Sequence, residues 1–182
     1  MKKAVGLLEF NSIAAGVEVI DTVIKSAVIE LVQAMPVCPG KYIAMFYGGV
    51  ASVQSAIETG EEASKDFMID SFILANVHDD LIPALTGTSE IEELKSLGII
   101  ETFSVASGIV AADIAVKTAQ ISLIEIRTAR GMGGKSTVFF TGDVGSVSMA
   151  VEAAAKSAGE EGLLVNKSVI PSLHKDLWDK IL

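Results

Sequence analysis

Cysteine is almost absent from this sequence: Cys38 is the only one in 182 residues. A single cysteine excludes an intrachain disulfide framework, and chains without disulfides are typical of the cytosol, so we expect a cytoplasmic protein. A lone cysteine is usually a small buried hydrophobic residue. One thiolate cannot hold a metal cluster by itself, so a metal role for Cys38 would require the same loop from other subunits around a symmetry axis.

Aromatic residues, basic residues and long hydrophobic runs are also scarce. Aromatics make up 5 % of a chain that is 50 % hydrophobic, so Ala, Val, Ile and Leu carry the apolar content. A net charge of −9 argues against nucleic acid, which needs a basic surface. No apolar run reaches the roughly 18 residues of a membrane span. The start of the chain lacks the apolar region of a signal peptide. We therefore expect neither a nucleic acid nor a membrane as partner, and the apolar excess suggests large buried interfaces.

The hydrophobic pattern predicts an α/β (α+β) chain in the order β-α-β-β-α-β-α. Ser12 is placed to cap a helix whose apolar residues Ile13, Val17, Ile20 and Ile24 share one face. The predicted strands cover residues 4–9, 28–35, 42–47 and 67–74, and the other helices cover 50–63 and 79–85. Gly48 and Gly49 are predicted to break the third strand after Tyr47.

The same order begins again after a polar linker at residues 86–93, so the chain is a tandem repeat. We expect the two domains to span residues 1–88 and 93–182, each built around a small antiparallel sheet. Equivalent residues lie 92 positions apart at first and 94 apart later. The matched pairs include Gly6 and Gly98, Glu9 and Glu101, Ser12 and Ser104, Lys25 and Lys117, and Gly40-Lys41 and Gly134-Lys135.

The spacing changes inside one loop, which therefore differs between the copies. In the first copy it runs from Met35 to Lys41 and holds Pro36, Val37, Cys38, Pro39 and Gly40. Two prolines indicate a rigid turn with Cys38 near its tip. The second copy has no cysteine there and instead carries a glycine-rich segment that contains Gly131, Met132, Gly133 and Gly134. Two copies that agree in their framework and differ in this loop imply a shared scaffold with one specialised position.

Several motifs resemble those of the bacterial microcompartment shell domain, over nearly the whole chain and twice. They are Ala-Val-Gly-Leu-Leu-Glu, Ser-Ile-Ala-Ala-Gly, Asp-Thr-Val-Ile-Lys-Ser-Ala, the Gly-Lys after the second strand, and Ile-Pro-Ser-Leu-His near the end. The chain is most similar to tandem-domain shell proteins of the propanediol-utilisation type with a Cys-Pro-Gly-Lys pore loop. Single-domain members usually have Ile-Pro-Arg-Pro-His where this chain has Ser172 and Leu173, so the arginine contact at the tile edge is not expected here.

The resemblance implies a structural shell protein in which a homotrimer imitates a hexamer and packs edge to edge with other shell proteins. It implies that Cys38 from three subunits holds a 4Fe-4S cluster at a central pore, for electron transfer or cluster transport. A cluster of this kind is expected to be lost from protein purified in air. Lys25 and Lys117 match the lysine through which neighbouring tiles meet. An encapsulated redox enzyme is a further candidate partner.

The sequence offers less support for nucleotide binding or catalysis. Residues 131–137, Gly-Met-Gly-Gly-Lys-Ser-Thr, superficially resemble a phosphate-binding loop, but the segment after them is predicted to be a strand and not the helix such a loop needs. His78 and His174 recur at equivalent places, which favours a structural hydrogen bond or cap. No set of nucleophile, base and oxyanion donor is visible, so we expect no enzyme. The alternative function is a small soluble redox carrier or a ligand-binding regulator built on a duplicated domain.

Overall fold

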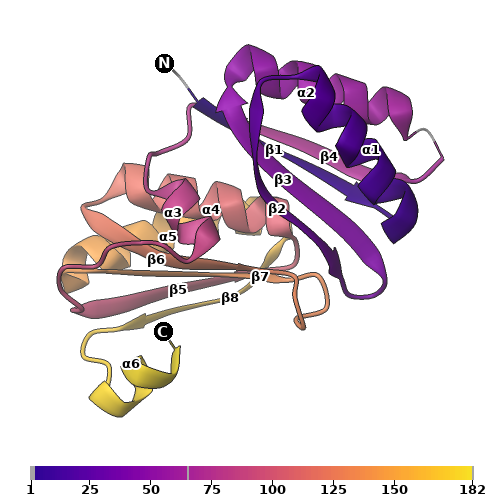
Figure 1. The fold of residues 1–182 in the computed structure, drawn as a ribbon. Helices are drawn as coiled ribbons and strands as arrows, with labels where there is room; N and C mark the ends of the chain where they lie inside the picture. Colours follow the sequence, from indigo (N-terminus) through magenta and orange to yellow (C-terminus); the bar gives the residue numbers. More distant parts are fainter. Residues whose placement is uncertain (1–2, 65, 182) are drawn as a thin grey trace. The chain divides into compact units, whose positions relative to one another are not determined.

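The structure contains the predicted element order twice (Figure 1). It is a computed structural model that describes residues 3–64 and 66–181, so residues 1 and 182, at the ends of the two expected domains, lie outside it. The first copy consists of β1 (Lys3–Phe10), α1 (Ile13–Ser26), β2 (Ile29–Val37), β3 (Lys41–Gly49), α2 (Val50–Ala63), β4 (Met68–Ala75) and α3 (Leu81–Thr86). The second consists of β5 (Ser96–Thr102), α4 (Val105–Thr118), β6 (Ile121–Thr128), β7 (Ser136–Gly142), α5 (Val144–Glu160), β8 (Leu164–Ile170) and α6 (Lys175–Ile181).

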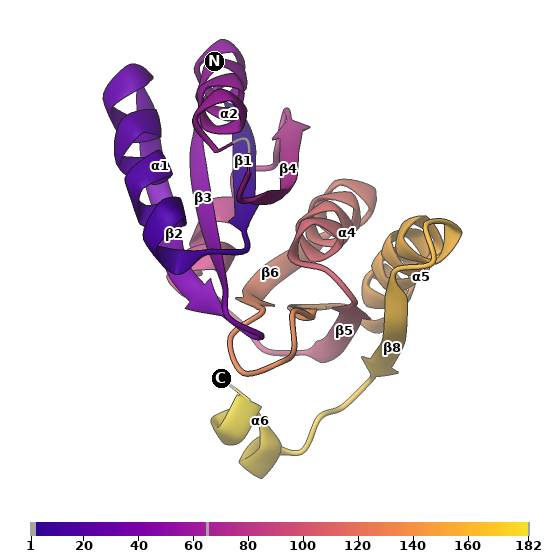
Figure 2. The same cartoon turned by 90° about the vertical axis from the view of Figure 1, so that its right-hand side faces the viewer.

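Each copy forms one four-stranded antiparallel sheet, which confirms the predicted fold class. The strand orders are β2-β3-β1-β4 and β6-β7-β5-β8, so β2 and β6 are equivalent edge strands. The pairing register is interrupted at equivalent places, between Leu31 and Gln33 in β2 and between Leu123 and Glu125 in β6. Two helices pack together on one face of each sheet, α1 with α2 and α4 with α5 (Figures 1 and 2).

The first helix of each copy begins at the serine predicted to cap it. The Ser12 side chain accepts a hydrogen bond from the Ala15 N–H at 3.3 Å. In the second copy, Ser104 accepts one from the Ser107 N–H at 3.1 Å. Such a cap satisfies an otherwise unpaired N–H at the helix start and contributes about 1 kcal/mol. The repeated cap fixes both helices at the same point relative to their sheets.

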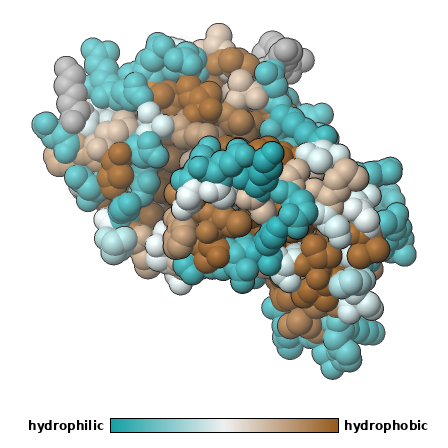
Figure 3. Space-filling model, turned by 180° about the vertical axis from the view of Figure 1, so that it is seen from behind, coloured by the Kyte–Doolittle hydropathy of each residue, from teal (hydrophilic) through white to brown (hydrophobic). Residues whose placement is uncertain are grey.

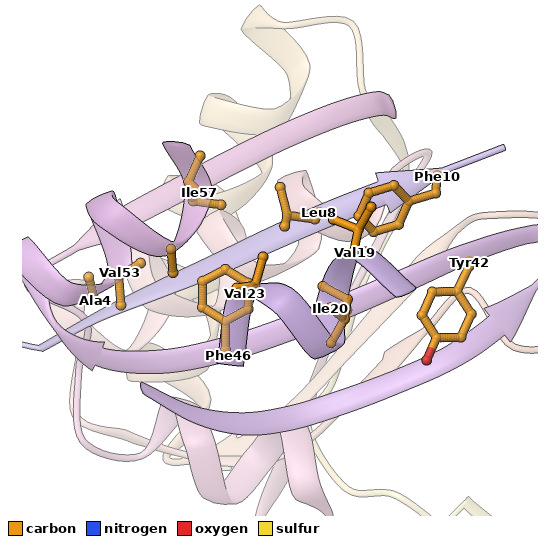
Figure 4. Close-up of a cluster of buried hydrophobic side chains, with 12 residues drawn as sticks. Ala4, Leu8, Phe10, Val19, Ile20, Val23, Tyr42, Phe46, Val53 and Ile57 are labelled. Atoms are coloured by element: carbon orange, nitrogen blue, oxygen red, sulfur yellow. The ribbon is translucent and has the colours of Figure 1, made fainter. Parts of the chain in front are cut away.

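The core of the first copy lies between its sheet and the two helices (Figure 4). Phe46 from β3 is fully buried there, and a Cβ on Gly6 of the neighbouring strand would lie 2.5 Å from its ring. Gly98 and Phe140 repeat this arrangement in the second copy, with a separation of 2.2 Å. The matched glycines therefore provide space for a phenylalanine ring under the helices, which explains why they recur.

The strands of the first hairpin, β2 and β3, extend further toward and beyond its loop than the sequence predicts. The predicted loop of Met35–Lys41 is shorter, because β2 continues through Pro36 to Val37 and β3 begins at Lys41. An edge strand tolerates proline, since one side of it needs no backbone donor. Gly48 and Gly49 do not break β3 but complete it. A Cβ on Gly48 would lie 3.2 Å from the Val28 carbonyl oxygen, so the glycine permits close approach of the backbone.

Packing divides the chain differently from the sequence repeat. The first compact unit contains residues 1–77 with 129–134, and the second contains 78–128 with 135–182. Helix α3 therefore ends the first copy by sequence but packs with β6 and α4 in the second unit. The counterpart of α3 in the second copy is α6, which packs on the face of the second sheet that α4 and α5 do not cover. There, Trp178 contacts a cluster that includes Leu97, Ile124 and Phe139. No described helix is long and apolar enough to cross a membrane.

The space beside Gly108 in α4 gives a stability prediction. A Cβ at Gly108 would lie 2.3 Å from Ser136 Oγ and 2.6 Å from Ser136 Cβ, which is held next to the backbone. Gly108→Ala should lower the free energy of unfolding by about 1–3 kcal/mol, as overpacking does in a filled core. Gly159→Ala in α5, where nothing lies within 4 Å, is the matched control and should be neutral or stabilising. Urea unfolding monitored by circular dichroism measures both, and equal effects would contradict the packing argument.

Candidate functional site

Cys38 lies at the tip of the β2–β3 hairpin. The turn is closed by a hydrogen bond from the Gly40 N–H to the Val37 carbonyl oxygen at 3.0 Å. Gly40 has a φ of 82°, which glycine adopts without the steric cost of a side chain. The peptide bond between Cys38 and Pro39 is cis. Cys38 is a free, exposed cysteine, so the hairpin presents its thiol outward.

An ion pair stands at the base of this loop and recurs in the second copy. Lys41 Nζ lies 2.8 Å from Glu9 Oε1, and Lys135 Nζ lies 3.0 Å from Glu101 Oε1. Both glutamates are near the end of the first strand of their copy, and both lysines directly follow the loop glycine. Because the ion pair occurs in both copies, it belongs to the shared framework, as expected for matched residues. It places one carboxylate and one ammonium group at the base of each loop.

The glycine-rich loop of the second copy has a different backbone. Gly131, Gly133 and Gly134 have φ values of 73°, 64° and 91°, in the region that favours glycine. The N–H of Met132 donates to the Ala129 carbonyl oxygen at 3.3 Å. The next residues form strand β7 and no helix, so the arrangement that a phosphate-binding loop needs is missing.

Lys25 and Lys117, which are predicted to lie at the tile edge, each form an ion pair with an aspartate one turn earlier in the same helix. Lys25 Nζ lies 2.5 Å from Asp21 Oδ2, and Lys117 Nζ lies 2.5 Å from Asp113 Oδ2. The surroundings differ, because the Asp21 side chain is 56 % exposed and that of Asp113 only 7 %. Lys25 and Lys117 lie at the ends of α1 and α4, whereas Cys38 lies on a hairpin. The predicted edge lysines and the predicted metal ligand Cys38 therefore belong to different secondary-structure elements.

His78 and His174 make the same local turn. In each, Nδ1 accepts a hydrogen bond at 3.3 Å from the N–H two residues later, Asp80 or Asp176. The His174 carbonyl oxygen also accepts from the N–H groups of Leu177 and Trp178 at the start of α6. These bonds confirm the expected structural hydrogen bond at both histidines.

Two surface cavities were not predicted from the sequence. Each lies at the open end of a hairpin, β2–β3 or β6–β7, far from the loop that joins the two strands. One, of about 480 Å³, is lined by residues that include Val28, Tyr47 and Gly48. The other, of about 460 Å³, is lined by their counterparts and by several acids. In this second cavity, the pKa of Lys95 is raised above its ordinary value. The main cause is Asp143, which accepts a hydrogen bond from Lys95 and is negatively charged, and Glu93 adds to the effect.

Among the described residues, no group of three or more His, Cys, Asp or Glu side chains could hold a metal ion. Among the described residues, Cys38 is thus not part of a ready-made set of metal ligands. Iron-sulfur clusters take several cysteine thiolates, so Cys38 of one chain does not suffice for such a cluster.

Comparison with known proteins identifies the family. The model of the BMC domain matches residues 4–77 and again residues 96–173. This chain belongs to the BMC domain family. The BMC shell protein PduT of Citrobacter freundii is 43 % identical over 182 residues, which is 100 % of this chain and 99 % of that protein. The BMC shell protein EutM of Salmonella typhimurium is 37 % identical over 84 residues, 46 % of this chain and 85 % of that protein.

A solved structure confirms the tandem BMC fold. The crystal structure of a microcompartment protein from Desulfitobacterium hafniense matches with a TM-score of 0.95 and 49 % identity, covering 97 % of this chain and 98 % of that one. The protein is thus a tandem-domain shell protein of bacterial microcompartments, as its motifs predicted. The BMC family is structural and not enzymatic, which confirms that expectation as well.

Exposure of the hairpin tip predicts the reactivity of Cys38. In metal-free protein, a maleimide should label one thiol per chain at nearly the rate of a small free thiol, because no packed side chain covers the sulfur. Intact-mass spectrometry over time measures the labelling, and Cys38→Ser is the unlabelled control. Labelling that required denaturant would mean that Cys38 is buried, contrary to this geometry.

Proposed function

We propose that this BMC protein forms a homotrimeric, pseudohexameric tile of a microcompartment shell, whose central pore holds a 4Fe-4S cluster on Cys38 of each subunit. The observation that carries the proposal is an exposed cysteine at the tip of a tight hairpin, present in one copy of the repeat and absent from the other. The BMC domains are proposed to span residues 1–88 and 93–182, and each range contains one match to the family model.

The trimer is supported by the duplicated BMC fold and by apolar surface that one chain leaves exposed. Three chains of two BMC domains would place six like domains in a ring closed by cyclic symmetry. Large hydrophobic side chains are exposed in the single chain, and Figure 3 shows such brown surface on one face. Examples are Val17 in α1 and Val28 before β2. Association of copies would remove such side chains from water, which stabilises an interface.

The residues of the hairpin fit an iron-sulfur cluster shared by three chains. Thiolate is the ligand that such clusters take, and a three-fold site supplies three of the usual four. The fourth iron position would be left to water or an exogenous ligand, which would make the cluster labile in air. The cluster would supply one-electron chemistry, for electron transfer across the shell or for export of the cluster itself.

The other residues of the loops have structural roles in this proposal. Pro39 restricts the loop before binding and Pro36 restricts the end of the strand that leads into it, which lowers the ordering cost, while Gly40 lets the chain turn beside the axis. Glu9 neutralises Lys41, so no unpaired charge of that lysine stands at the root of the hairpin. The loop with Gly131, Met132, Gly133 and Gly134 is proposed to line the same pore without contributing a ligand.

Reconstitution tests the cluster. Trimers incubated anaerobically with iron and sulfide should absorb near about 400 nm and hold about four iron atoms per trimer, and Cys38 should become protected from maleimide. Cys38→Ala is the control and should give neither the absorbance nor the iron. Light scattering of both proteins establishes the trimer. Identical spectra and iron content in the two proteins would remove Cys38 as a ligand and leave a plain pore.

The tile edge is proposed to contain Lys25 and Lys117, with other shell proteins as neighbours. A lysine stem can lie against a neighbouring tile while its ammonium reaches backbone carbonyls. We expect Lys25→Ala combined with Lys117→Ala to abolish extended sheets in electron micrographs while the trimer persists in light scattering. Lys25→Ala alone should change stability little, since its ion pair is exposed. Unaltered sheets in the double variant would show that these lysines are not edge contacts.

A further inference from the structure

Arg130 begins the glycine-rich loop of the second copy at the position that Cys38 takes in the first. In the registers of the two hairpins, Pro36 of β2 is equivalent to Thr128 of β6. Cys38 follows Pro36 by two residues, and Arg130 follows Thr128 by two residues. The loop that carries a thiol in one copy therefore carries a guanidinium group in the other.

The backbone next to Arg130 is fixed on one side and open on the other. Ala129, directly before it, is 1 % exposed and has a φ of 45°. A positive φ is uncommon for alanine and persists where the surrounding structure holds it. A Cβ on Gly131, directly after Arg130, would meet nothing within 4 Å. Arg130 is exposed, so its side chain reaches solvent from an anchored point at the start of the loop.

Arg130 supplies a positive charge that no described side chain neutralises. Cys38 and Arg130 are the only residues of the loop segments 38–40 and 130–134 with an ionisable side chain. The lysines directly after the two loops are both paired with glutamates, whereas Arg130 has no described ion-pair partner. A guanidinium group is always charged, and its N–H groups bind carboxylates in pairs. Each chain therefore offers one unused guanidinium group at its loops.

Packing brings the Arg130 loop together with the copy that carries Cys38. Residues 129–134 belong to the same compact unit as residues 1–77, although β6 and β7 on either side of the loop belong to the second unit. A fixed charge raises the local concentration of ions of opposite sign over roughly one Debye length, about 8 Å at physiological salt. A cation in the unit that presents the thiol is therefore placed to attract anions toward it.

We propose that Arg130 makes the rim of the pore an anion-binding site, where its guanidinium group holds a small carboxylate near the Cys38 thiols. This inference rests on the proposed trimer, in which three chains bring three guanidinium groups and three thiols to one pore. It also names the class of ligand for the iron position that three thiolates leave open in the proposed cluster. A carboxylate bound by Arg130 has the negative charge and the oxygen donor that suit this position.

Two alkylating reagents of different charge test the site in cluster-free trimers. In both reactions the thiolate sulfur of Cys38 bonds to carbon and iodide leaves, but iodoacetate is an anion and iodoacetamide is neutral. Arg130→Gln should lower the ratio of the iodoacetate rate to the iodoacetamide rate roughly threefold, the effect of one exposed ion pair. The ratio cancels any change in the thiolate fraction of Cys38. Intact-mass spectrometry measures both rates.

Two control variants separate the position of the charge from its amount. Arg130→Lys keeps the positive charge and should retain most of the ratio. Lys175→Gln removes one exposed positive charge from α6, outside the loops, and should leave the ratio at the wild-type value. Equal ratios in wild type, Arg130→Gln and Lys175→Gln would overturn the site.

Competition by acetate tests the class of ligand. At constant ionic strength, replacing sodium chloride by sodium acetate should lower the rate ratio in wild type, because acetate occupies the guanidinium group. The same exchange should leave the ratio of Arg130→Gln unchanged. An equal ratio of wild type in the two salts would show general screening of charge and would overturn the bound carboxylate.

The outcomes distinguish this site from the proposed function. Trimers that gain absorbance on reconstitution but show no effect of Arg130→Gln on the ratio overturn the anion site and leave the cluster standing. Trimers that show the effect but gain no absorbance support the anion site and remove the cluster. Monomers in light scattering at micromolar concentration overturn both, because neither a shared pore nor a shared cluster then exists.

Discussion

The packing of two helices on one face of a four-stranded sheet is the constraint on which the rest of this protein depends. It fixes the helix starts through the Ser12 and Ser104 caps and requires glycine at positions 6 and 98, where phenylalanine rings enter the core. Because the helices and sheet are built alike in both copies, the hairpins that leave the sheet edge are fixed in the same way. The loops can therefore differ without disturbing the scaffold.

This separation of scaffold and loop explains how one BMC chain can carry a specialised position. The ion pairs Glu9–Lys41 and Glu101–Lys135 are repeated because they belong to the framework. Cys38 is not repeated, and it stands at the tip of a hairpin that presents it to solvent. Among the described residues, no group of three or more metal-ligating side chains includes Cys38, so a metal role for this thiol depends on copies of the loop from other chains.

The two copies also differ at their edges. In the second copy, α3 packs beside α4 and β6, and the buried Asp113 side chain accepts a hydrogen bond from the His78 N–H. The first copy keeps Asp21 and Leu31 exposed at the same place.

The sequence by itself determined the duplicated element order, the serine caps and the family, because hydrophobic periodicity, capping residues and repeated motifs are local signals. It also predicted Cys38 as the distinctive residue of its loop. Only the tertiary structure decided that β2 extends through Pro36 and Val37, that Gly48 lies within a strand, and that α3 packs into the second unit. These features depend on which strand lies at a sheet edge and on which surfaces meet, and such contacts between distant residues leave no pattern in adjacent ones.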